Sequence, residues 1–185
     1  MIDDVLLEAE EKMEKALEVA RGDFSKIRSG RANPEMFTTL LVDYYGAPTP
    51  LQQLATVSIP EARTVLITPY DRSAMKDIER AIAESDLGVN PTDDGQLLRI
   101  NMPPLTEERR RDYVKLAKGK AEDARVSVRG VRRKAKEALD KIKKDGEAGE
   151  DDVARAEKDL ESLTKKFVDQ VDSILDGKEK ELMEI

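Results

Sequence analysis

Four cationic side chains occupy one stripe of a predicted helix. Arg125, Arg129, Arg132 and Lys136 follow one another at spacings of four, three and four residues. Side chains at these spacings lie on the same face of an α-helix. Cations held in such a row suit the phosphates of a polyanion. The same pattern also suits a solvated face or ion pairs with a neighbouring helix, which contribute about 0–1 kcal/mol when exposed. The four residues alone leave both interpretations open.

The helix that must carry this stripe is predicted over residues 106–144. Beside the cations, small apolar residues recur at intervals of three or four: Ala121, Ala124, Val128, Val131, Ala135 and Ala138. This narrow seam is typical of a helix that packs against other helices. Thr106 is a candidate N-cap, with Glu107 and Glu108 in the first turn. A helix packed on one side can present the neighbouring cations in fixed positions.

Charge is distributed unevenly along a chain whose formal net charge is −7. Residues 106–144 carry 15 basic and 7 acidic side chains, whereas residues 145–185 carry 6 basic and 14 acidic ones. Residues 1–29 and 30–105 are also net acidic. An acidic helix neutralises a basic one only where their faces meet, so we expect basic charge to remain available on the outer face.

Two further helices are predicted, over residues 2–28 and 151–183. The first has its apolar stripe at Leu6, Ala9, Met13, Ala16, Ala20, Phe24 and Ile27, and the second at Val153, Ala156, Leu160, Leu163, Phe167, Val171 and Ile174. Lys26 and Arg28 are expected near the negative end of the first helix dipole. Three helices with matching apolar seams bury those seams best by packing into one bundle.

The middle of the chain has a different character, because all eight prolines lie between Pro34 and Pro104. Short β-type runs occur at residues 40–45, 55–59, 64–68 and 97–100, and a short helix is predicted over residues 75–85. Gly46, Pro48 and Pro50 predict a turn. We therefore expect an α+β protein in which a three-helix bundle (1–29 and 106–185) carries an inserted mixed α/β domain (30–105).

An inserted domain needs two chain crossings, which we expect to form a two-strand hinge. The crossings are predicted at Ser29 to Pro34 and at Met102 to Leu105. The hinge residues are Ser29, Gly30, Ala32, Pro34, Met102, Pro103, Pro104 and Leu105. Paired crossings restrict motion to bending and twisting, and Pro103-Pro104 stiffens one of them.

The composition argues against catalysis. Without His or Cys there is no usual zinc site, no Ser-His-Asp triad and no Cys-His pair. The acidic pairs Asp93-Asp94 and Asp151-Asp152 could bind Mg²⁺, but they fit turn residues and helix N-terminal charges better. We predict no enzyme activity, no metal and no cofactor.

The same composition sets an expectation for the compartment. The absence of Cys makes a reducing cytosol the default. The N-terminus has no signal-peptide pattern, and no stretch approaches the roughly 18 apolar residues of a membrane span. We expect a soluble cytoplasmic monomer with no membrane partner.

Several segments together resemble the ribosome recycling factor family over the whole length of the chain. They are Ile27–Ala32 with Pro34, Tyr44–Gly46 with Thr49–Leu51, Leu87–Pro91, Pro103–Arg110, Val128-Arg129 with Val131–Arg133, and Lys178-Glu179. Each segment alone is weak, but their order and spacing together are highly specific.

The resemblance implies a fold and a function. It implies an L-shaped molecule with a tRNA-like outline, whose long arm is the bundle and whose short arm is a β/α/β sandwich-like inserted domain. Family members act after termination of protein synthesis. With elongation factor G and GTP hydrolysis by that partner, they split the ribosome into subunits and release mRNA and tRNA. The bundle is implied to lie on large-subunit rRNA.

The resemblance also favours rRNA contact for the cationic stripe. Arg132 is the strongest candidate, because with Arg129 it lies in the family's Val-Arg-x-Val-Arg-Arg segment. The full candidate rRNA-binding set is Arg132, Arg129, Arg28, Arg31, Arg125, Arg133 and Lys136. Arg28 and Arg31 flank Gly30 and could instead complement the helix dipole.

Tyr44 and Tyr45 alternate on a predicted strand, so one is expected in the core and the other in solvent. The exposed ring could stack on a base or contact a partner, or both rings could simply support the fold. Two other functions stay open from the residues alone. One is an interaction protein that binds an acidic protein surface, and the other is a Mg²⁺-dependent enzyme.

Overall fold

The computed structural model describes residues 1–184, which divide into two compact units. The first unit comprises Met1–Phe24 and Val114–Lys180, and the second comprises Ser25–Tyr113 with the chain from Glu181 onward. Long helices dominate the first unit and a small sheet lies in the second. The expected α+β fold class is therefore confirmed.

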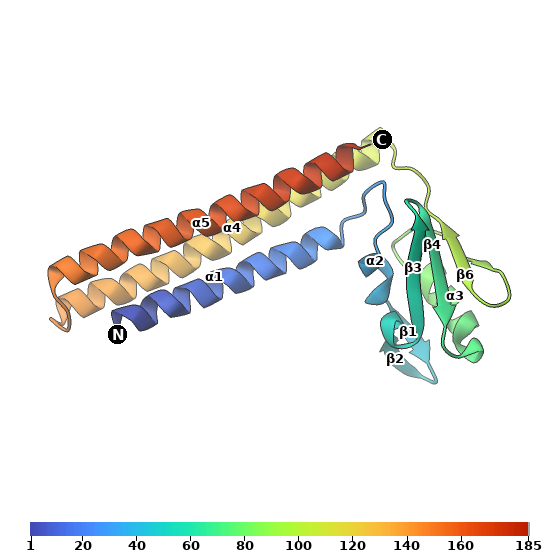
Figure 1. Ribbon diagram of the computed structural model, residues 1–185, viewed down its shortest axis with the longest axis horizontal. Helices are drawn as coiled ribbons and strands as arrows, with labels where there is room; N and C mark the ends of the chain where they lie inside the picture. The colour runs from blue at the N-terminus through green and yellow to red at the C-terminus, as the bar shows by residue number, and fades with distance from the viewer. Residues whose placement is uncertain (185) are drawn as a thin grey trace. The chain divides into compact units, whose positions relative to one another are not determined.

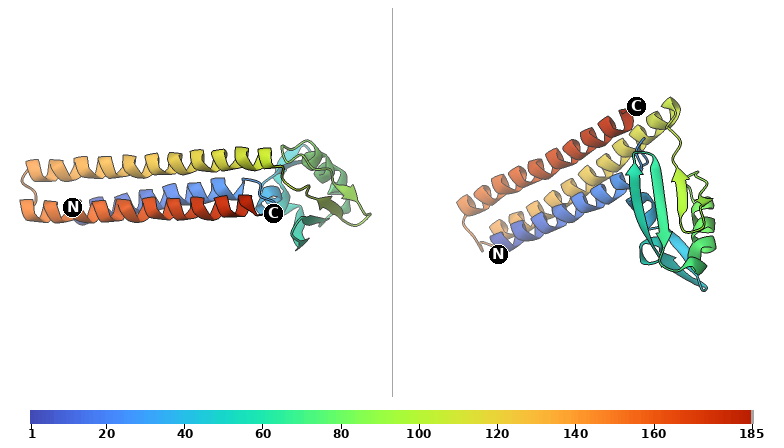
Figure 2. Two further views of the ribbon diagram at one scale, coloured as in Figure 1. Left: turned by 90° about the horizontal axis from the view of Figure 1, so that it is seen from above. Right: turned by 45° about the vertical axis from the view of Figure 1, so that its right-hand side comes forward.

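Three long helices build the first unit. Helices α1 (Ile2–Ser25), α4 (Glu107–Lys144) and α5 (Glu150–Met183) run side by side, with α4 antiparallel to the other two (Figures 1 and 2). Their apolar stripes meet in a core that includes Met13, Leu17, Val128, Leu160 and Phe167, all almost completely buried. The predicted bundle packing therefore follows from the three-four spacing of apolar residues.

Local sequence signals predicted the start of α4 correctly but not the end of α1. Thr106 caps α4 as expected, because its Oγ1 accepts a hydrogen bond from the backbone N–H of Arg109 at 3.1 Å. The predicted end of the first helix at residue 28 is wrong, since α1 ends at Ser25. Lys26 and Arg28 therefore lie beyond its last turn. The Arg28 side chain instead donates a hydrogen bond to the carbonyl of Pro103, and the Ser29 hydroxyl donates one to the carbonyl of Arg31.

A four-stranded antiparallel sheet forms the centre of the second unit. Its order is β3 (Ala55–Glu61), β4 (Thr64–Pro69), β6 (Leu98–Asn101) and β5 (Thr92–Asp93). In the register between β4 and β6, Val65 lies opposite Ile100 and Ile67 opposite Leu98. These four side chains are fully buried, which places them on the core face.

Two helices contribute to the core on that face of the sheet. Helix α3 (Met75–Ala83) contributes Ile78 and Ile82, and the short α2 (Glu35–Thr38) contributes Phe37. The predicted strands at 55–59, 64–68 and 97–100 and the helix near 75–85 are present with shifted ends. Helix α2 and strand β5 were not expected, because each is too short to show periodicity.

A separate hairpin joins β1 (Leu41–Tyr44) to β2 (Ala47–Pro50). Its two turn residues, Tyr45 and Gly46, have φ values of +51° and +80°, as a two-residue I′ turn requires. The predicted turn at Gly46, Pro48 and Pro50 is thus wrong beyond Gly46. Both prolines lie in β2, which tolerates them because an edge strand has unpaired backbone positions.

Both expected crossings, Ser29–Pro34 and Met102–Leu105, fall inside the second unit. Their role as a hinge, like the expected domain boundaries, stays a prediction. Over residues 1–184, none of the helices combines the length and the apolar character that crossing a membrane requires.

Candidate nucleic-acid interface

Arg125 is the member of the cationic stripe that the fold holds most firmly. Its Nε and Nη2 donate hydrogen bonds to Oδ1 of Asp172 on α5, at 2.9 and 2.6 Å, and its Nη1 bonds to Glu122 at 3.1 Å. The side chain is only 19% exposed. The hydrogen bonding of the Arg125 guanidinium to the Asp172 carboxylate is the main cause that raises the pKa of Arg125. The Arg125 guanidinium therefore joins α4 to α5 and has little capacity left for a ligand.

Arg132 and Arg129 are held much more loosely. Nη1 of Arg132 lies 3.6 Å from Oε1 of Glu161 on α5, and the Arg132 side chain is 41% exposed. Nη1 of Arg129 lies 3.7 Å from Oε1 of Glu122, and both side chains are about half exposed. These distances are too long for hydrogen bonds. Such exposed pairs cost about 0–1 kcal/mol to separate, so both guanidiniums remain available.

The Nε of Arg132 adds a second reason to regard it as available. This atom is buried and has no hydrogen-bond partner within the described chain. A buried donor without a partner is unfavourable. A rearrangement of the guanidinium towards an incoming acceptor would therefore cost the protein little.

Arg133 and Lys136 are exposed and form no ion pair within residues 1–184. With Arg129 and Arg132 they make up what we call the open stripe of α4. Arg125 belongs to the same sequence pattern but lies outside this open set. The structure thus places five of the seven candidates on α4. They differ in how strongly they bind neighbouring carboxylates: Arg125 is bound tightly, and the four residues of the open stripe weakly or not at all.

The other two candidates lie in the second unit. Nη2 of Arg28 donates to the carbonyl of Pro103, which connects the residue just before the first predicted crossing to the second crossing. Burial is the main cause that lowers the pKa of Arg28; Tyr113 raises it and Arg109 lowers it further. Arg31 is exposed, with its Nε 3.6 Å from Oε2 of Glu184. Arg28 is therefore a structural contact, whereas Arg31 can reach a ligand.

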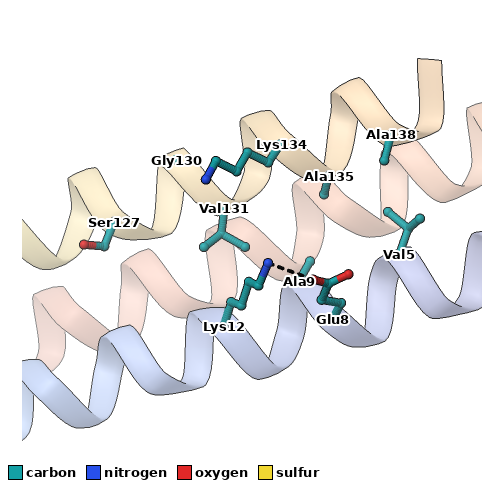
Figure 3. Close-up of a pocket in the computed structure, with 10 residues that line it drawn as sticks. All are labelled: Val5, Glu8, Ala9, Lys12, Ser127, Gly130, Val131, Lys134, Ala135 and Ala138. Atoms are coloured by element: carbon teal, nitrogen blue, oxygen red, sulfur yellow. Dashed lines mark ion pairs between the residues drawn. The ribbon is translucent and has the colours of Figure 1, made fainter. Parts of the chain in front are cut away.

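The α1–α4 side of the bundle carries a groove whose lining includes two lysines, Lys12 and Lys134. A groove of about 510 Å³ runs there between the two helices, and Figure 3 shows the residues that line it. Its walls include Val5, Ala9, Val131 and Ala138. The polar pair on its rim, Glu8 and Lys12, is joined by an ion pair at 2.7 Å. Small side chains in the seam account for this groove.

The acidic pairs have structural partners. Asp93 Oδ1 accepts the backbone N–H of Gly95 at 2.7 Å, and Asp94 pairs with Arg99 at 3.2 Å. Asp151 and Asp152 lie in the first turn of α5. Across residues 1–184, no three His, Cys, Asp or Glu side chains are grouped so that they could hold a metal ion. These placements favour the turn and helix-start roles for the acids.

Ion pairs between the stripe and carboxylates of the neighbouring helix were one interpretation of the sequence, but the individual residues, Glu161 and Asp172, were not identified. Glu161 and Asp172 are eleven residues apart, which is about three helical turns and returns to the same face. This spacing was the only feature of the sequence that indicated that the two carboxylates share one face of the helix. Which cation each carboxylate meets depends on the register between two antiparallel helices, and periodicity carries no information about it.

Comparisons with known proteins agree with one another. The family described as Ribosome recycling factor matches residues 20–183. The ribosome-recycling factors of Kineococcus radiotolerans and Beutenbergia cavernae are each 68% identical over 185 residues, covering all of both chains. A solution structure of the ribosome recycling factor matches with a TM-score of 0.80 and 40% identity, covering 100% of this chain and 98% of that one.

A second solved structure is also similar. It contains models for the T. thermophilus ribosome recycling factor and the E. coli elongation factor G bound to the E. coli post-termination complex. The match has a TM-score of 0.71 and 41% identity and covers both chains completely.

Proposed function

The chain belongs to the ribosome recycling factor family, and from this membership we infer that it acts on the post-termination ribosome in the cytoplasm. With elongation factor G and GTP, it separates the ribosome into subunits so that mRNA and tRNA leave. Identity over the full length, and a similar chain solved with elongation factor G on a post-termination complex, support this function. GTP hydrolysis belongs to the partner, so this chain is a factor without catalysis of its own.

The open stripe of α4 contacts phosphates of large-subunit rRNA. The observation that carries this assignment is the contrast within one helix. Arg125 is committed to Asp172, while Arg129, Arg133 and Lys136 are exposed and Arg132 is partly exposed, and these four are weakly paired or unpaired. Planar guanidiniums can form bidentate, charge-assisted hydrogen bonds with phosphate.

The carboxylates next to the stripe are weak partners that a phosphate can replace. When a phosphate approaches, it replaces Glu161 as the partner of Arg132, and the exposed pair that is lost was worth little. Arg125 contributes indirectly, because its bonds to Asp172 keep the basic helix in register with α5. Packing against α1 and α5 holds α4 straight, so the cations meet the RNA without further ordering of the backbone.

The inserted domain (30–105) moves relative to the bundle (1–29 and 106–185) when the GTPase acts. The predicted hinge is formed by Ser29–Pro34 and Met102–Leu105. The hydrogen bond from Arg28 to the carbonyl of Pro103 supports this proposal, because it connects the chain just before the first crossing to the second crossing.

Cosedimentation with purified large subunits tests the RNA interface. If four cations neutralise four phosphates, the logarithm of the binding constant should fall with the logarithm of salt concentration at a slope of about −3 to −4. Ribonuclease treatment of the subunits should abolish binding. Binding that resists both salt and ribonuclease would instead favour the alternative, a bundle that recognises an acidic protein surface.

A further inference from the structure

Two glutamate carboxylates lie beside the open stripe without forming hydrogen bonds to it. Oε1 of Glu161 on α5 is 3.6 Å from Nη1 of Arg132, and Oε1 of Glu122 on α4 is 3.7 Å from Nη1 of Arg129. A charge-assisted hydrogen bond between a guanidinium and a carboxylate has a length of about 2.7–2.9 Å. The two glutamates are therefore loose ion-pair partners of the stripe.

Both carboxylates are nevertheless fixed within reach of the stripe. Oε2 of Glu122 accepts a hydrogen bond from Nη1 of Arg125 at 3.1 Å, so Glu122 is shared between Arg125 and Arg129. Glu161 belongs to α5, and the hydrogen bonds between Arg125 and Asp172 connect that helix to α4. A group held on the same molecule competes at an effective concentration that dilution does not change. Each of these arginines that releases a ligand therefore has a carboxylate beside it.

The two loose pairs contribute little to the bundle itself. The side chains of Glu161 and Glu122 are 61% and 56% exposed, and ion pairs that face solvent add little to stability. Their effect falls on the RNA interface, because a phosphate must displace the carboxylate before it can form bidentate hydrogen bonds with the guanidinium. The same carboxylate can pair with the guanidinium again when the hydrogen bonds to the phosphate open. The geometry therefore shortens the lifetime of an RNA complex.

We propose that Glu161, together with Glu122, sets how quickly the protein leaves the large subunit. As a contact between Arg132 and a phosphate opens, Glu161 pairs with the guanidinium and competes with re-formation of the contact. A protein that acts on one ribosome after another must leave each large subunit before the next round, so these carboxylates favour turnover. The inference deepens the proposed function and rests on it, because the open stripe is the rRNA contact of that function.

The test removes one carboxylate with little change in side-chain size. Glu161→Gln removes the negative charge that pairs with Arg132. Asp159→Asn is the matched control, because it makes the same charge change two residues away on α5. Asp159 lines a groove with Asp3 and Leu6 of α1, so it lies on the side of α5 that meets α1. Thermal unfolding confirms that each variant is folded.

The rate of dissociation from large subunits is the decisive measurement. The protein carries a fluorescent label, is bound to purified large subunits and is chased with an excess of unlabelled protein. We expect Glu161→Gln to dissociate about two- to fivefold more slowly than the wild type, which is the range that an exposed ion pair supplies. Asp159→Asn should dissociate at nearly the wild-type rate.

The same change should appear in ribosome splitting as inhibition by its product. Free large subunits compete with intact ribosomes for the protein. With elongation factor G and GTP present, they should inhibit splitting by Glu161→Gln at about two- to fivefold lower concentration than splitting by the wild type. A variant that had merely lost a structural contact would not become more sensitive to free large subunits.

The Arg132→Ala background separates direct competition from general charge. If Glu161 acts through Arg132, adding Glu161→Gln to Arg132→Ala should leave the dissociation rate of that variant unchanged. Slowing that persists in this background, or equal slowing by Asp159→Asn, would assign the effect to net charge and overturn the inference.

An unchanged dissociation rate in Glu161→Gln would overturn it as well. That result would leave the proposed function intact, provided that the wild-type chain binds large subunits. If the wild-type chain itself fails to bind them, the proposed function is wrong and the inference falls with it.

Discussion

Arg125 and Asp172 are joined by two hydrogen bonds to a single carboxylate oxygen, at 2.9 and 2.6 Å, across 47 residues of sequence. The contact connects α4 to α5 beside the bundle core, and the Arg125 side chain is only 19% exposed. One cation of the basic stripe therefore maintains the helix register that presents the others.

This relationship predicts that Arg125→Ala destabilises the bundle. Losing hydrogen bonds between charged groups should lower the free energy of unfolding by about 1–3 kcal/mol. Chemical denaturation followed by helical circular dichroism measures the change. A double-mutant cycle with Asp172→Ala should show strong coupling, and Arg125→Lys should rescue only part of the loss because it lacks the planar fork. Additive effects of the two alanine variants would contradict a direct interaction.

Arg132→Ala, in contrast to Arg125→Ala, should weaken binding to large subunits without destabilising the bundle. Affinity for large subunits should fall by about tenfold, and the salt slope should become shallower by roughly 1, as expected for one lost phosphate contact. The melting temperature should hardly change, because Arg132 makes only a long ion pair and its Nε has no partner in the described chain.

Arg155→Ala is the matched control for Arg132. Arg155 is exposed on the acidic helix α5 and forms no ion pair within residues 1–184. Its replacement removes the same charge from another part of the bundle, so binding should change far less. Normal large-subunit binding by Arg132→Ala would show that the open stripe has been assigned wrongly.

Shortening the first crossing should separate binding from splitting. Deletion of Gly30 alters the segment Ser29–Pro34 but touches none of the cations of α4. We expect large-subunit binding to persist and subunit splitting to be lost, because the inserted domain can no longer reorient. Cosedimentation and light scattering measure the two activities. Splitting at the wild-type rate would argue against a moving domain.

The stability of the second unit should decrease in strong alkali in a way that depends on Tyr44. Burial is the first cause that raises the pKa of Tyr44, and the charge of Asp71 is the second. The folded state therefore keeps the phenol protonated to higher pH than the unfolded state does. The resulting stabilisation is fully present below about pH 10, the ordinary tyrosine value, and is lost as the pH rises through the higher folded value.

Denaturation at a series of pH values tests this expectation. Tyr44→Phe should flatten the alkaline decline, and Asp71→Asn should bring the pKa of Tyr44 closer to its ordinary value by removing the negative charge. An alkaline decline that is identical in Tyr44→Phe and the wild type would assign it to other groups.

Gly119→Ala should stabilise α4. The residue is exposed inside the helix, and a Cβ at this position would meet nothing within 4 Å. Replacing a helical glycine by alanine contributes about 1 kcal/mol. A higher free energy of unfolding with unchanged large-subunit binding is the expected result. A loss of binding with retained stability would show instead that this part of α4 approaches the RNA backbone closely.

Local patterns of residue spacing in the sequence predicted most of the fold. The three-four spacing of residues such as Met13, Val128 and Phe167 predicted the long helices, because a helix buries one face whatever its partner is. The hairpin was harder to predict. Pro48 and Pro50 look like turn residues, yet they extend β2, since strand pairing with β1 outweighs their low β propensity. The end of α1 at Ser25 also escaped prediction.

By itself, the sequence determined that this chain forms three amphipathic helices, with a small α/β segment between the first and the second along the chain, and that a row of cations lies along one of them. Those properties depend on residue spacing within a single element. Only the tertiary structure decided which cations are free. Asp172 and Glu161 are equally acidic in the sequence, but the register of α5 against α4 brings one within hydrogen-bonding distance of Arg125 and leaves the other 3.6 Å from Arg132.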